Sequence, residues 1–137
     1  MPVFLQYISL FVMGGLGYGL LETICRGFTH WTMLVTGGAC FSLMYRICTC
    51  FREPKWKKWI MCGAAITAVE FVAGGIVNIL MNWNVWDYSS RKLNLMGQIC
   101  FLFSVLWVLL SIPVTELCLF LQKNVFCTKL KKISKKR

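Results

Sequence analysis

Four long apolar stretches run through the sequence and limit what the chain can fold into. They cover residues 3–25, 31–51, 59–81 and 95–121, and each has about the 20 residues that a helix needs to cross the hydrocarbon layer of a membrane. A chain of 137 residues with 58% hydrophobic content carries more apolar surface than one small soluble core can hide. Lipid offers no partner for free backbone groups, and the stretches lack the alternating period of a β-barrel. The sequence therefore predicts an all-α integral membrane protein folded as a four-helix transmembrane bundle.

The first and second stretches are less regular spans than the other two. The second carries Gly37 and Gly38 early and Arg46 near its end, so it spans only if the Arg46 side chain reaches the interface. The first has no Lys or Arg before it and no small-residue cleavage site before Glu22. We therefore expect it to be retained as a span rather than removed as a signal peptide.

The basic residues predict the orientation of the bundle. They gather in two regions, between the second and third stretches (Arg46, Arg52, Lys55, Lys57 and Lys58) and after the fourth (Lys123, Lys129, Lys131, Lys132, Lys135, Lys136 and Arg137). With four spans both regions lie on one side, and the positive-inside rule makes that side cytoplasmic. We expect a multi-pass protein of the cell membrane with both termini in the cytoplasm: a transmembrane domain over residues 1–122 and a basic cytoplasmic tail over residues 123–137.

The net charge of +10 comes mainly from these two basic regions. Only Arg26, Arg91 and Lys92 fall on the opposite side of the predicted bundle. Because the positive charge flanks membrane segments, it favours the lipid bilayer as the partner, with attraction to anionic lipid, over a nucleic acid.

The eight cysteines fit a membrane interior better than a disulfide framework. Most lie in the apolar stretches or on the predicted cytoplasmic side, including Cys48, Cys50, Cys62, Cys118 and Cys127. A buried cysteine acts there as a small apolar residue. The Cys-Thr-Cys sequence at residues 48–50 has the wrong spacing for a zinc site. We expect no metal and no other cofactor.

The two halves of the chain share a pattern. Residues 37–41 read Gly-Gly-Ala-Cys-Phe and residues 97–101 read Gly-Gln-Ile-Cys-Phe, and the apolar stretch before each carries a glutamate, Glu22 or Glu70. Two repeated helical hairpins explain the pattern, and chance similarity between apolar segments is the alternative. Each hairpin would hold two spans, so the halves would share one orientation, unlike the inverted repeats of many transporters.

Small and polar residues recur at steps of three and four along three of the predicted helices, which places them on one face of each. The members are Gly15, Gly19, Glu22 and Arg26 in the first helix, Gly63, Thr67, Glu70, Gly74 and Asn78 in the third, and Gly97, Cys100, Ser104, Trp107 and Ser111 in the fourth. Small residues let helices approach closely in lipid. We expect these faces to meet inside the bundle, although Gly15 and Gly19 suit a homodimer contact equally well.

Glu70 lies near the middle of its span, where a bare carboxylate costs at least about 2.5 kcal/mol. Three things would offset that cost: protonation, a hydrogen bond to Asn78 or Thr67 on the same helix face, or a cation from another helix. An ionisable residue inside a membrane is by default a candidate site for an ion, proton or substrate. A protonated carboxyl that only packs is the alternative.

Two further ionisable groups lie at the predicted outer boundary. Glu22 has Arg26 one turn away, a spacing that suits an ion pair. His30 is the only histidine, so it cannot build a multi-histidine metal site. Its imidazole suits either a general acid or base, or an interfacial hydrogen-bonding or capping role.

The segment from Trp83 to Ser89 is dense in aromatic and polar residues. Trp and Tyr favour the headgroup zone, which accounts for much of it. Asp87 has three possible roles: it can cap the loop through backbone amides, pair with Arg91 or Lys92, or bind a cationic group of a ligand.

The sequence Trp86-Asp87-Tyr88-Ser89, followed by Asn94 and by Gly-Gln-Ile-Cys at residues 97–100, resembles the signature of the CmpB-type ABC-transporter type IV family. The first half adds Glu22, Arg26, His30 and the glycine pair at residues 37–38, and the resemblance covers about residues 14–111. It implies a permease-like role, without a substrate that carries over. The sequence shows no Walker motif, so ATP-driven activity would need a separate ATPase subunit.

The function expected from these features is a permease-like transport component with a polar site that opens to the extracytoplasmic side. The candidate ligand-binding or transport residues are Glu22, Arg26, His30, Glu70, Asn78, Trp86, Asp87, Tyr88 and Asn94. Two alternatives remain. One is a structural or regulatory membrane subunit, and the other is a membrane-interface enzyme acting on a lipid or envelope substrate with a carboxylate or His30 as acid or base. No residue is assigned as catalytic.

Overall fold

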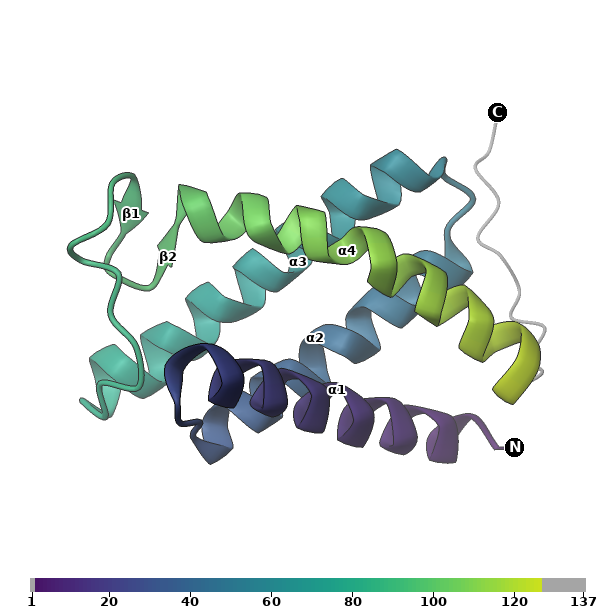
Figure 1. Cartoon of the computed structure of the whole chain (residues 1–137), viewed down its shortest axis with the longest axis horizontal. Helices are drawn as coiled ribbons and strands as arrows, with labels where there is room; N and C mark the ends of the chain where they lie inside the picture. The colour runs from purple at the N-terminus through teal and green to yellow at the C-terminus, as the bar shows by residue number, and fades with distance from the viewer. Residues whose placement is uncertain (1, 127–137) are drawn as a thin grey trace.

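Four long helices make up most of the chain, for which we obtained a computed structural model that describes residues 2–126 (Figure 1). The helices are α1 (Val3–Arg26), α2 (Trp31–Cys50), α3 (Lys55–Gly74) and α4 (Phe101–Phe120). Two short π-helical segments extend α3 and α4, namely η1 (Gly75–Leu80) and η2 (Leu121–Val125). All four helices are long and apolar enough to cross a membrane, which confirms the predicted fold class. The first residues of the predicted tail, 123–125, belong to η2. Residues 127–137 of the tail, with Cys127, lie outside the described residues.

The bounds of the helices nearly coincide with the predicted spans for the first two helices and differ from them for the fourth. The fourth helix starts at Phe101 instead of residue 95, because a two-stranded antiparallel hairpin precedes it. Its strands are β1 (Asn94–Leu95) and β2 (Ile99–Cys100). Met96 and Gly97 between them have φ values of 54° and 71°, a left-handed conformation that a right-handed helix cannot contain. Gly97 and Cys100 therefore lie before the helix whose stripe they were expected to share.

The third helix begins four residues earlier than predicted, at Lys55. Pro54 precedes it with φ −61° and accepts hydrogen bonds from the backbone N–H groups of Lys57 and Lys58. Proline is well suited to a helix start, because its fixed φ is helical and its missing N–H would have no partner there.

Glycines bring α1 and α2 into very close contact. A Cβ atom built on Gly14 would lie 2.3 Å from Phe41 Cβ and 2.8 Å from the Gly37 carbonyl oxygen. On Gly37, a Cβ would lie 2.5 Å from Tyr18 Cβ. Close backbone approach maximises van der Waals packing, which drives helix association in lipid. The two helices are therefore joined along a seam that admits only glycine.

The same seam decides how the predicted Gly15 and Gly19 motif is used. A Cβ on Gly15 would lie 2.7 Å from the Leu34 carbonyl oxygen, and one on Gly19 would lie 2.3 Å from the Leu34 side chain. Because α2 covers this face within one chain, a homodimer, which stays a prediction, would have to use another surface.

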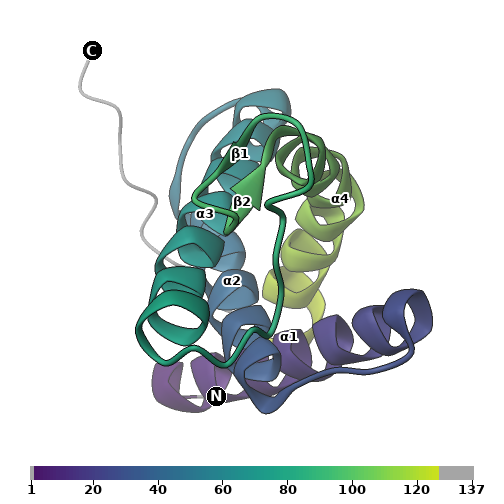
Figure 2. The same ribbon diagram turned by 90° about the vertical axis from the view of Figure 1, so that its left-hand side faces the viewer.

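Helix α2 lies at the centre of the bundle, where it contacts α1, α3 and α4 (Figure 2). It is the most buried of the four helices, although Arg46 near its end is exposed. Helices α3 and α4 form the second hairpin, in which Gly63 packs on Val108 and the Thr67 hydroxyl bonds the Ser104 hydroxyl at 3.2 Å. Gly63, Glu70, Gly74 and Asn78 are buried, so the polar stripe of the third helix faces inward as expected.

The proposed sequence repeat falls in two different surroundings. Residues 37–41 lie inside α2, whereas residues 97–101 form a turn, a strand and the first residue of α4. The chain does form two helical hairpins, α1 with α2 and α3 with α4. The matched residues, however, do not occupy equivalent positions in them.

Replacing Gly14 with alanine tests the α1–α2 seam. The new methyl group meets rigid atoms of Phe41 and Gly37, so the free energy of unfolding should fall by about 1–3 kcal/mol, as for other overpacked cores. Gly17→Ala is the matched control, since a Cβ there meets nothing within 4 Å. Unfolding in mixed micelles, followed by circular dichroism, measures both. Equal stabilities of the two variants would contradict the packing described here.

Candidate functional site

The loop between α3 and α4 is fastened to the bundle by Asn78. The Asn78 Oδ1 atom accepts a hydrogen bond from the Val85 amide at 2.7 Å, and its Nδ2 donates to Gln98 Oε1 at 2.8 Å. Trp86 is buried nearby and donates from Nε1 to the Gln98 carbonyl oxygen at 3.0 Å. Asn78 and Trp86, both predicted as ligand-binding residues, therefore hold the loop in place. Asn78 gives no hydrogen bond to Glu70, contrary to one of the expected arrangements.

Asp87 forms a turn within the same loop. Its Oδ1 atom accepts hydrogen bonds from the Ser89 amide, at 2.8 Å, and from the Ser89 hydroxyl. These bonds hold the pKa of Asp87 below its usual value, because they stabilise the carboxylate. Of the three roles considered for Asp87, the structure shows the capping of loop amides.

The contacts of Gly97 explain why a glycine follows the Trp-Asp-Tyr-Ser sequence at this position. The Gly97 carbonyl accepts a hydrogen bond from the Tyr88 amide at 2.7 Å. A Cβ on Gly97 would lie 2.6 Å from Ser89 Oγ and 2.8 Å from Asp87 Oδ1. Asn94 completes the fastening, since its Nδ2 donates to the Arg91 carbonyl at 2.7 Å and its Oδ1 accepts from the Gly97 amide at 3.1 Å.

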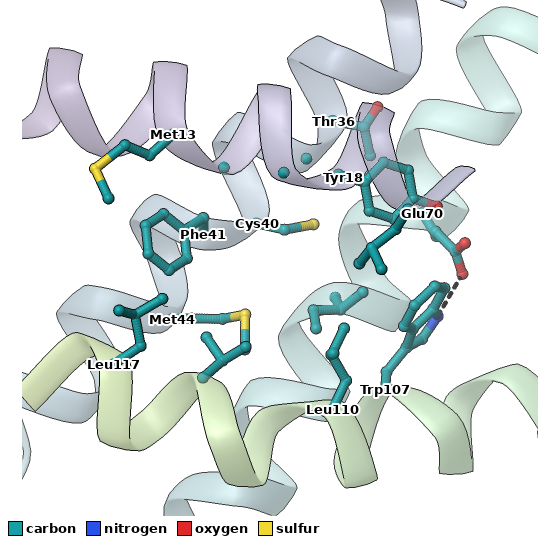
Figure 3. A pocket seen from close by; sticks show the side chains of 16 residues that line it. Met13, Tyr18, Thr36, Cys40, Phe41, Met44, Glu70, Trp107, Leu110 and Leu117 are labelled. Atoms are coloured by element: carbon teal, nitrogen blue, oxygen red, sulfur yellow. Dashed lines mark hydrogen bonds between the residues drawn. The ribbon is translucent and has the colours of Figure 1, made fainter. Parts of the chain in front are cut away.

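The fastened loop presents Tyr88 to Glu70. Glu70 is only 3% exposed, and Trp107 of α4 donates from Nε1 to its Oε2 at 3.0 Å (Figure 3). The Tyr88 hydroxyl lies 3.5 Å from Glu70 Oε1, a long hydrogen bond, and the Tyr88 ring stacks on Phe103 with centroids 5.0 Å apart. Neither Thr67 nor Asn78 bonds Glu70. Two neutral donors from outside α3 do so, and neither was among the expected partners.

Tyr88 keeps its hydroxyl proton at neutral pH and can therefore donate a hydrogen bond. Burial raises the pKa of its hydroxyl, and the neighbouring Glu70 carboxyl raises it further. Trp107 offers a donor only, because the indole nitrogen has no free lone pair in the ring plane. Both groups are hydrogen-bond donors, so the Glu70 carboxyl acts as the acceptor in its bonds with Tyr88 and Trp107.

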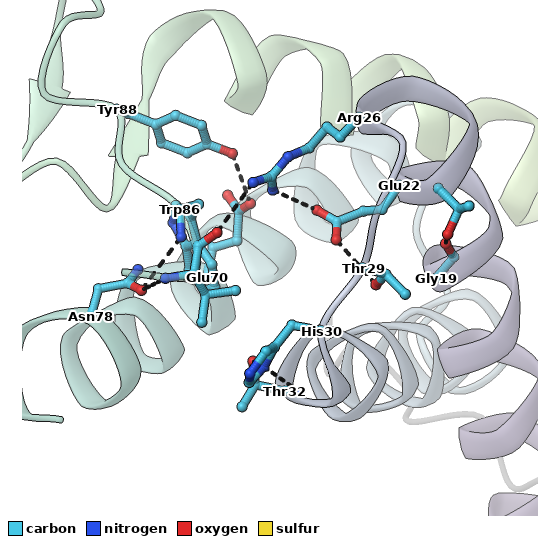
Figure 4. A network of polar contacts seen from close by, with 12 residues as sticks. Gly19, Glu22, Arg26, Thr29, His30, Thr32, Glu70, Asn78, Trp86 and Tyr88 are labelled. Atoms are coloured by element: carbon cyan, nitrogen blue, oxygen red, sulfur yellow. Dashed lines mark hydrogen bonds and ion pairs between the residues drawn. The ribbon is translucent and has the colours of Figure 1, made fainter. Parts of the chain in front are cut away.

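Glu22 and Arg26 form the predicted ion pair at the C-terminal end of α1. Arg26 Nη1 donates to Glu22 Oε1 at 3.1 Å, and the Thr29 hydroxyl donates to Glu22 Oε2 at 3.3 Å. Arg26 Nη2 also donates to the Val85 carbonyl at 3.2 Å, which ties α1 to the loop. Figure 4 shows Glu22, Arg26 and Tyr88 pointing toward the same region as Glu70.

His30 is separate from this cluster. Its Nδ1 accepts a hydrogen bond from the Thr32 amide at 3.3 Å and caps the start of α2. Its ring lies against Trp31 and Trp83, with centroid distances of 5.7 and 6.0 Å. The structure therefore shows the capping role for His30.

A cavity of about 210 Å³ lies between α1 and α4, with Glu70 in its wall. Figure 3 shows α1 and α4 on two sides of this space. Its polar end consists of Tyr18, Thr36, Cys40, Glu70 and Trp107. Its other end is apolar and includes Met13, Phe41, Met44 and Leu117.

Sequence reasoning singled out Glu70 but missed the residues that share its cavity. Trp107 was on the predicted stripe of the fourth helix, three residues after Ser104, so its helical position was a usable signal. Tyr18, Thr36 and Cys40 carried no comparable signal, because their approach to Glu70 depends on how α1 and α2 pack.

The four membrane-crossing helices around a buried carboxyl define a small multi-pass membrane protein. The sequence profile of one family matches residues 8–136, which include the loop signature, Glu70 and Trp107. The chain belongs to this family, which is described as "Putative ABC-transporter type IV". No curated protein and no solved structure matches the chain.

The role of Asn78 is tested by Asn78→Ala. The change leaves the Val85 amide and the Gln98 side chain without their partner, which costs about 1–3 kcal/mol for a buried group. Amide hydrogen exchange across residues 83–98 should accelerate, while exchange in α1 and α2 stays unchanged. Ser90→Ala, at an exposed position of the same loop, is the control. Unchanged exchange in Asn78→Ala would refute the fastening role.

The turn at Asp87 predicts a specific pH dependence. Because the folded pKa is lowered, the turn gains stability above the unfolded pKa of about 3.9 and loses it as the pH falls through the folded pKa. Asp87 is the only aspartate, so carboxyl-¹³C-aspartate gives one NMR signal. We expect its titration midpoint below about 3.9, and a higher midpoint in Ser89→Ala. A midpoint that Ser89→Ala leaves in place would argue against the turn.

Proposed function

We propose that the protein is a permease-like component of a membrane transporter, with its substrate site at the Glu70 end of the cavity. The observation that carries the proposal is a carboxyl buried among membrane-spanning helices that also lines a cavity of about 210 Å³. Acids inside a membrane are costly, and in transporters they mark substrate and ion paths. Pockets with apolar walls and a few convergent polar groups are typical ligand sites.

The cavity is the reason to prefer transport over a packing role for Glu70. Protein interiors are close-packed, with few voids larger than a water molecule. A carboxyl that only held helices together would be enclosed by its partners. Glu70 instead receives one short hydrogen bond, from Trp107, and one long one, from Tyr88, and its side chain also lines the cavity.

The polar groups continue from Glu70 toward the end of the bundle that carries the α3–α4 loop. Tyr88 bonds Glu70, and the Glu22–Arg26 ion pair points toward the same region and contacts the loop at Val85. In the opposite direction the cavity lining is apolar, with side chains such as Met44 and Leu117. This gradient supports a polar site that lies toward the loop end of the bundle.

The distribution of positive charge supports an extracytoplasmic position for the loop end. Arg46, Arg52 and Lys55 lie at the other end of the helices, together with Lys123 in η2. By the positive-inside rule, this distribution favours a cytoplasmic position for that end and for both termini. Energy from ATP would come from a separate ATPase subunit that meets this cytoplasmic face, in keeping with the family description and with the lack of a Walker motif in the sequence.

Glu70→Gln tests the transport role. Untargeted mass spectrometry compares small molecules in cells and medium for cells that express the wild type, Glu70→Gln or Glu116→Gln. Glu116 is the matched control, because it is exposed and pairs with Lys55 at 2.5 Å, away from the cavity. We expect wild-type expression to redistribute at least one compound, Glu70→Gln to reduce that effect at least about tenfold, equal to about 1.4 kcal/mol, and Glu116→Gln to preserve it.

Expression level and size-exclusion profile establish that Glu70→Gln is folded. A folded Glu70→Gln variant that redistributes the compound as the wild type does would place Glu70 among packing residues. The structural or regulatory alternative would then be the better account of the protein.

A further inference from the structure

We infer that the cavity binds a cationic amphipathic molecule, which enters from the bilayer between α1 and α4 and places its cationic group beside Glu70. This inference deepens the proposed function and rests on it, because it names the class of substrate for the same site. Three features of the cavity support it: the direction of its opening, the charge of its lining and its size.

The cavity opens toward lipid. Helix α1 packs along α2, and its backbone has few contacts with α4 in the described part of the chain. Met13 and Leu21 of α1 and Leu117 of α4 line the cavity and are 41%, 47% and 42% exposed. Exposed apolar side chains in the middle of membrane-spanning helices border hydrocarbon. The mouth between α1 and α4 therefore faces the acyl chains, and an apolar chain can pass it without entering water.

The lining selects for positive charge. Glu70 is the only Asp, Glu, Lys, Arg or His among the residues that line the cavity, although the chain carries a net charge of +10. A carboxylate has about four lone-pair sites, so the bonds from Trp107 and Tyr88 leave it with acceptor capacity. A charge in a low-dielectric site is stabilised strongly by an opposite charge close by.

Two aromatic rings strengthen this preference. Tyr18 of α1 and Trp107 of α4 meet beside Glu70 with ring centroids 6.1 Å apart, and both line the cavity. Ring faces attract cations, most strongly when water is excluded. An ammonium group at the polar end would thus lie near one carboxyl and two aromatic rings.

The volume limits how much of the molecule can be enclosed. An engineered cavity of about 150 Å³ in another protein holds one benzene molecule. At about 210 Å³ this cavity holds a small cationic group with the first part of a chain, but not a whole lipid. The remaining tail would lie in the mouth between α1 and α4, against Met13, Leu21 and Leu117. A single-chain amine or quaternary ammonium compound fits this description.

Three probes with the same decyl chain separate the effect of the cationic group from that of the apolar tail. They are decyltrimethylammonium, decanol and decyl sulfate, each added at equal mole fraction to full-length protein in neutral-lipid nanodiscs. The protein is labelled with 5-fluorotryptophan, and the Trp107 signal among the six tryptophans is assigned with Trp107→Phe. We expect a saturable shift of this signal at a concentration at least about tenfold lower for decyltrimethylammonium than for the other two probes.

Glu70→Gln should remove this preference, so that the three probes act within about threefold of one another. Glu116→Gln should keep it. Equal binding of the three probes to the wild type, a preference that survives Glu70→Gln, or no saturable shift at all would each overturn the inference.

A second pair of variants tests the path of entry without changing charge. Gly17 lines the cavity, and a Cβ there meets nothing within 4 Å, so Gly17→Leu adds an apolar side chain at the mouth at a position that has room for its Cβ. Gly75→Leu is the matched control, at a glycine with equally open space that does not line the cavity. Gly17→Leu should weaken decyltrimethylammonium binding at least about tenfold, and Gly75→Leu should not. Unchanged binding in Gly17→Leu would refute entry between α1 and α4.

These outcomes are independent of the transport assay. Cation preference without any Glu70-dependent redistribution of compounds would support the binding site and reject transport. Redistribution that depends on Glu70, without cation preference, would support transport and reject the class of substrate inferred here.

Discussion

The glycine seam between α1 and α2 is the contact on which the rest of the architecture depends. It holds the two backbones so close that a methyl group on Gly14 or Gly37 would overlap its neighbours. Helix α1 is thereby committed to α2 and stays apart from α4, and the cavity is the space that this choice leaves. In water such a gap would be closed by the hydrophobic effect. In lipid the acyl chains are as apolar as the side chains, so nothing forces the gap to close.

The α3–α4 loop solves a second problem, the presence of a carboxyl among apolar helices. Donors for Glu70 have to come from elements that reach it across the bundle. Trp107 does so from α4, and Tyr88 does so from a loop that Asn78 fastens to the end of α3. Many of the polar residues in the loop therefore serve to position one hydroxyl group, which gives a physical reason for the Trp-Asp-Tyr-Ser sequence and the glycine that follows it.

The sequence predicted what depends on composition and helical period. The four spans, the inward stripe of the third helix and the Glu22–Arg26 pair all follow from spacing along a single element. The start of α4 could not be predicted in this way, because the left-handed conformations of Met96 and Gly97 belong to a hairpin that packs against the loop. The partners of Glu70 were missed for the same reason, since Tyr88 and Trp107 are 18 and 37 residues away along the chain.

Trp107 both lines the cavity and donates a hydrogen bond to the acid. A movement of α4 away from both α1 and α3 would widen the gap and would also stretch the bond from its indole to Glu70. Such a movement would take the Trp107 donor away from Glu70. The positive group of an entering ligand would then stabilise the carboxylate in place of that donor. Access to the cavity would thus be coupled to the loss of the Trp107–Glu70 hydrogen bond, and the carboxyl would keep this donor as long as the helices stay together.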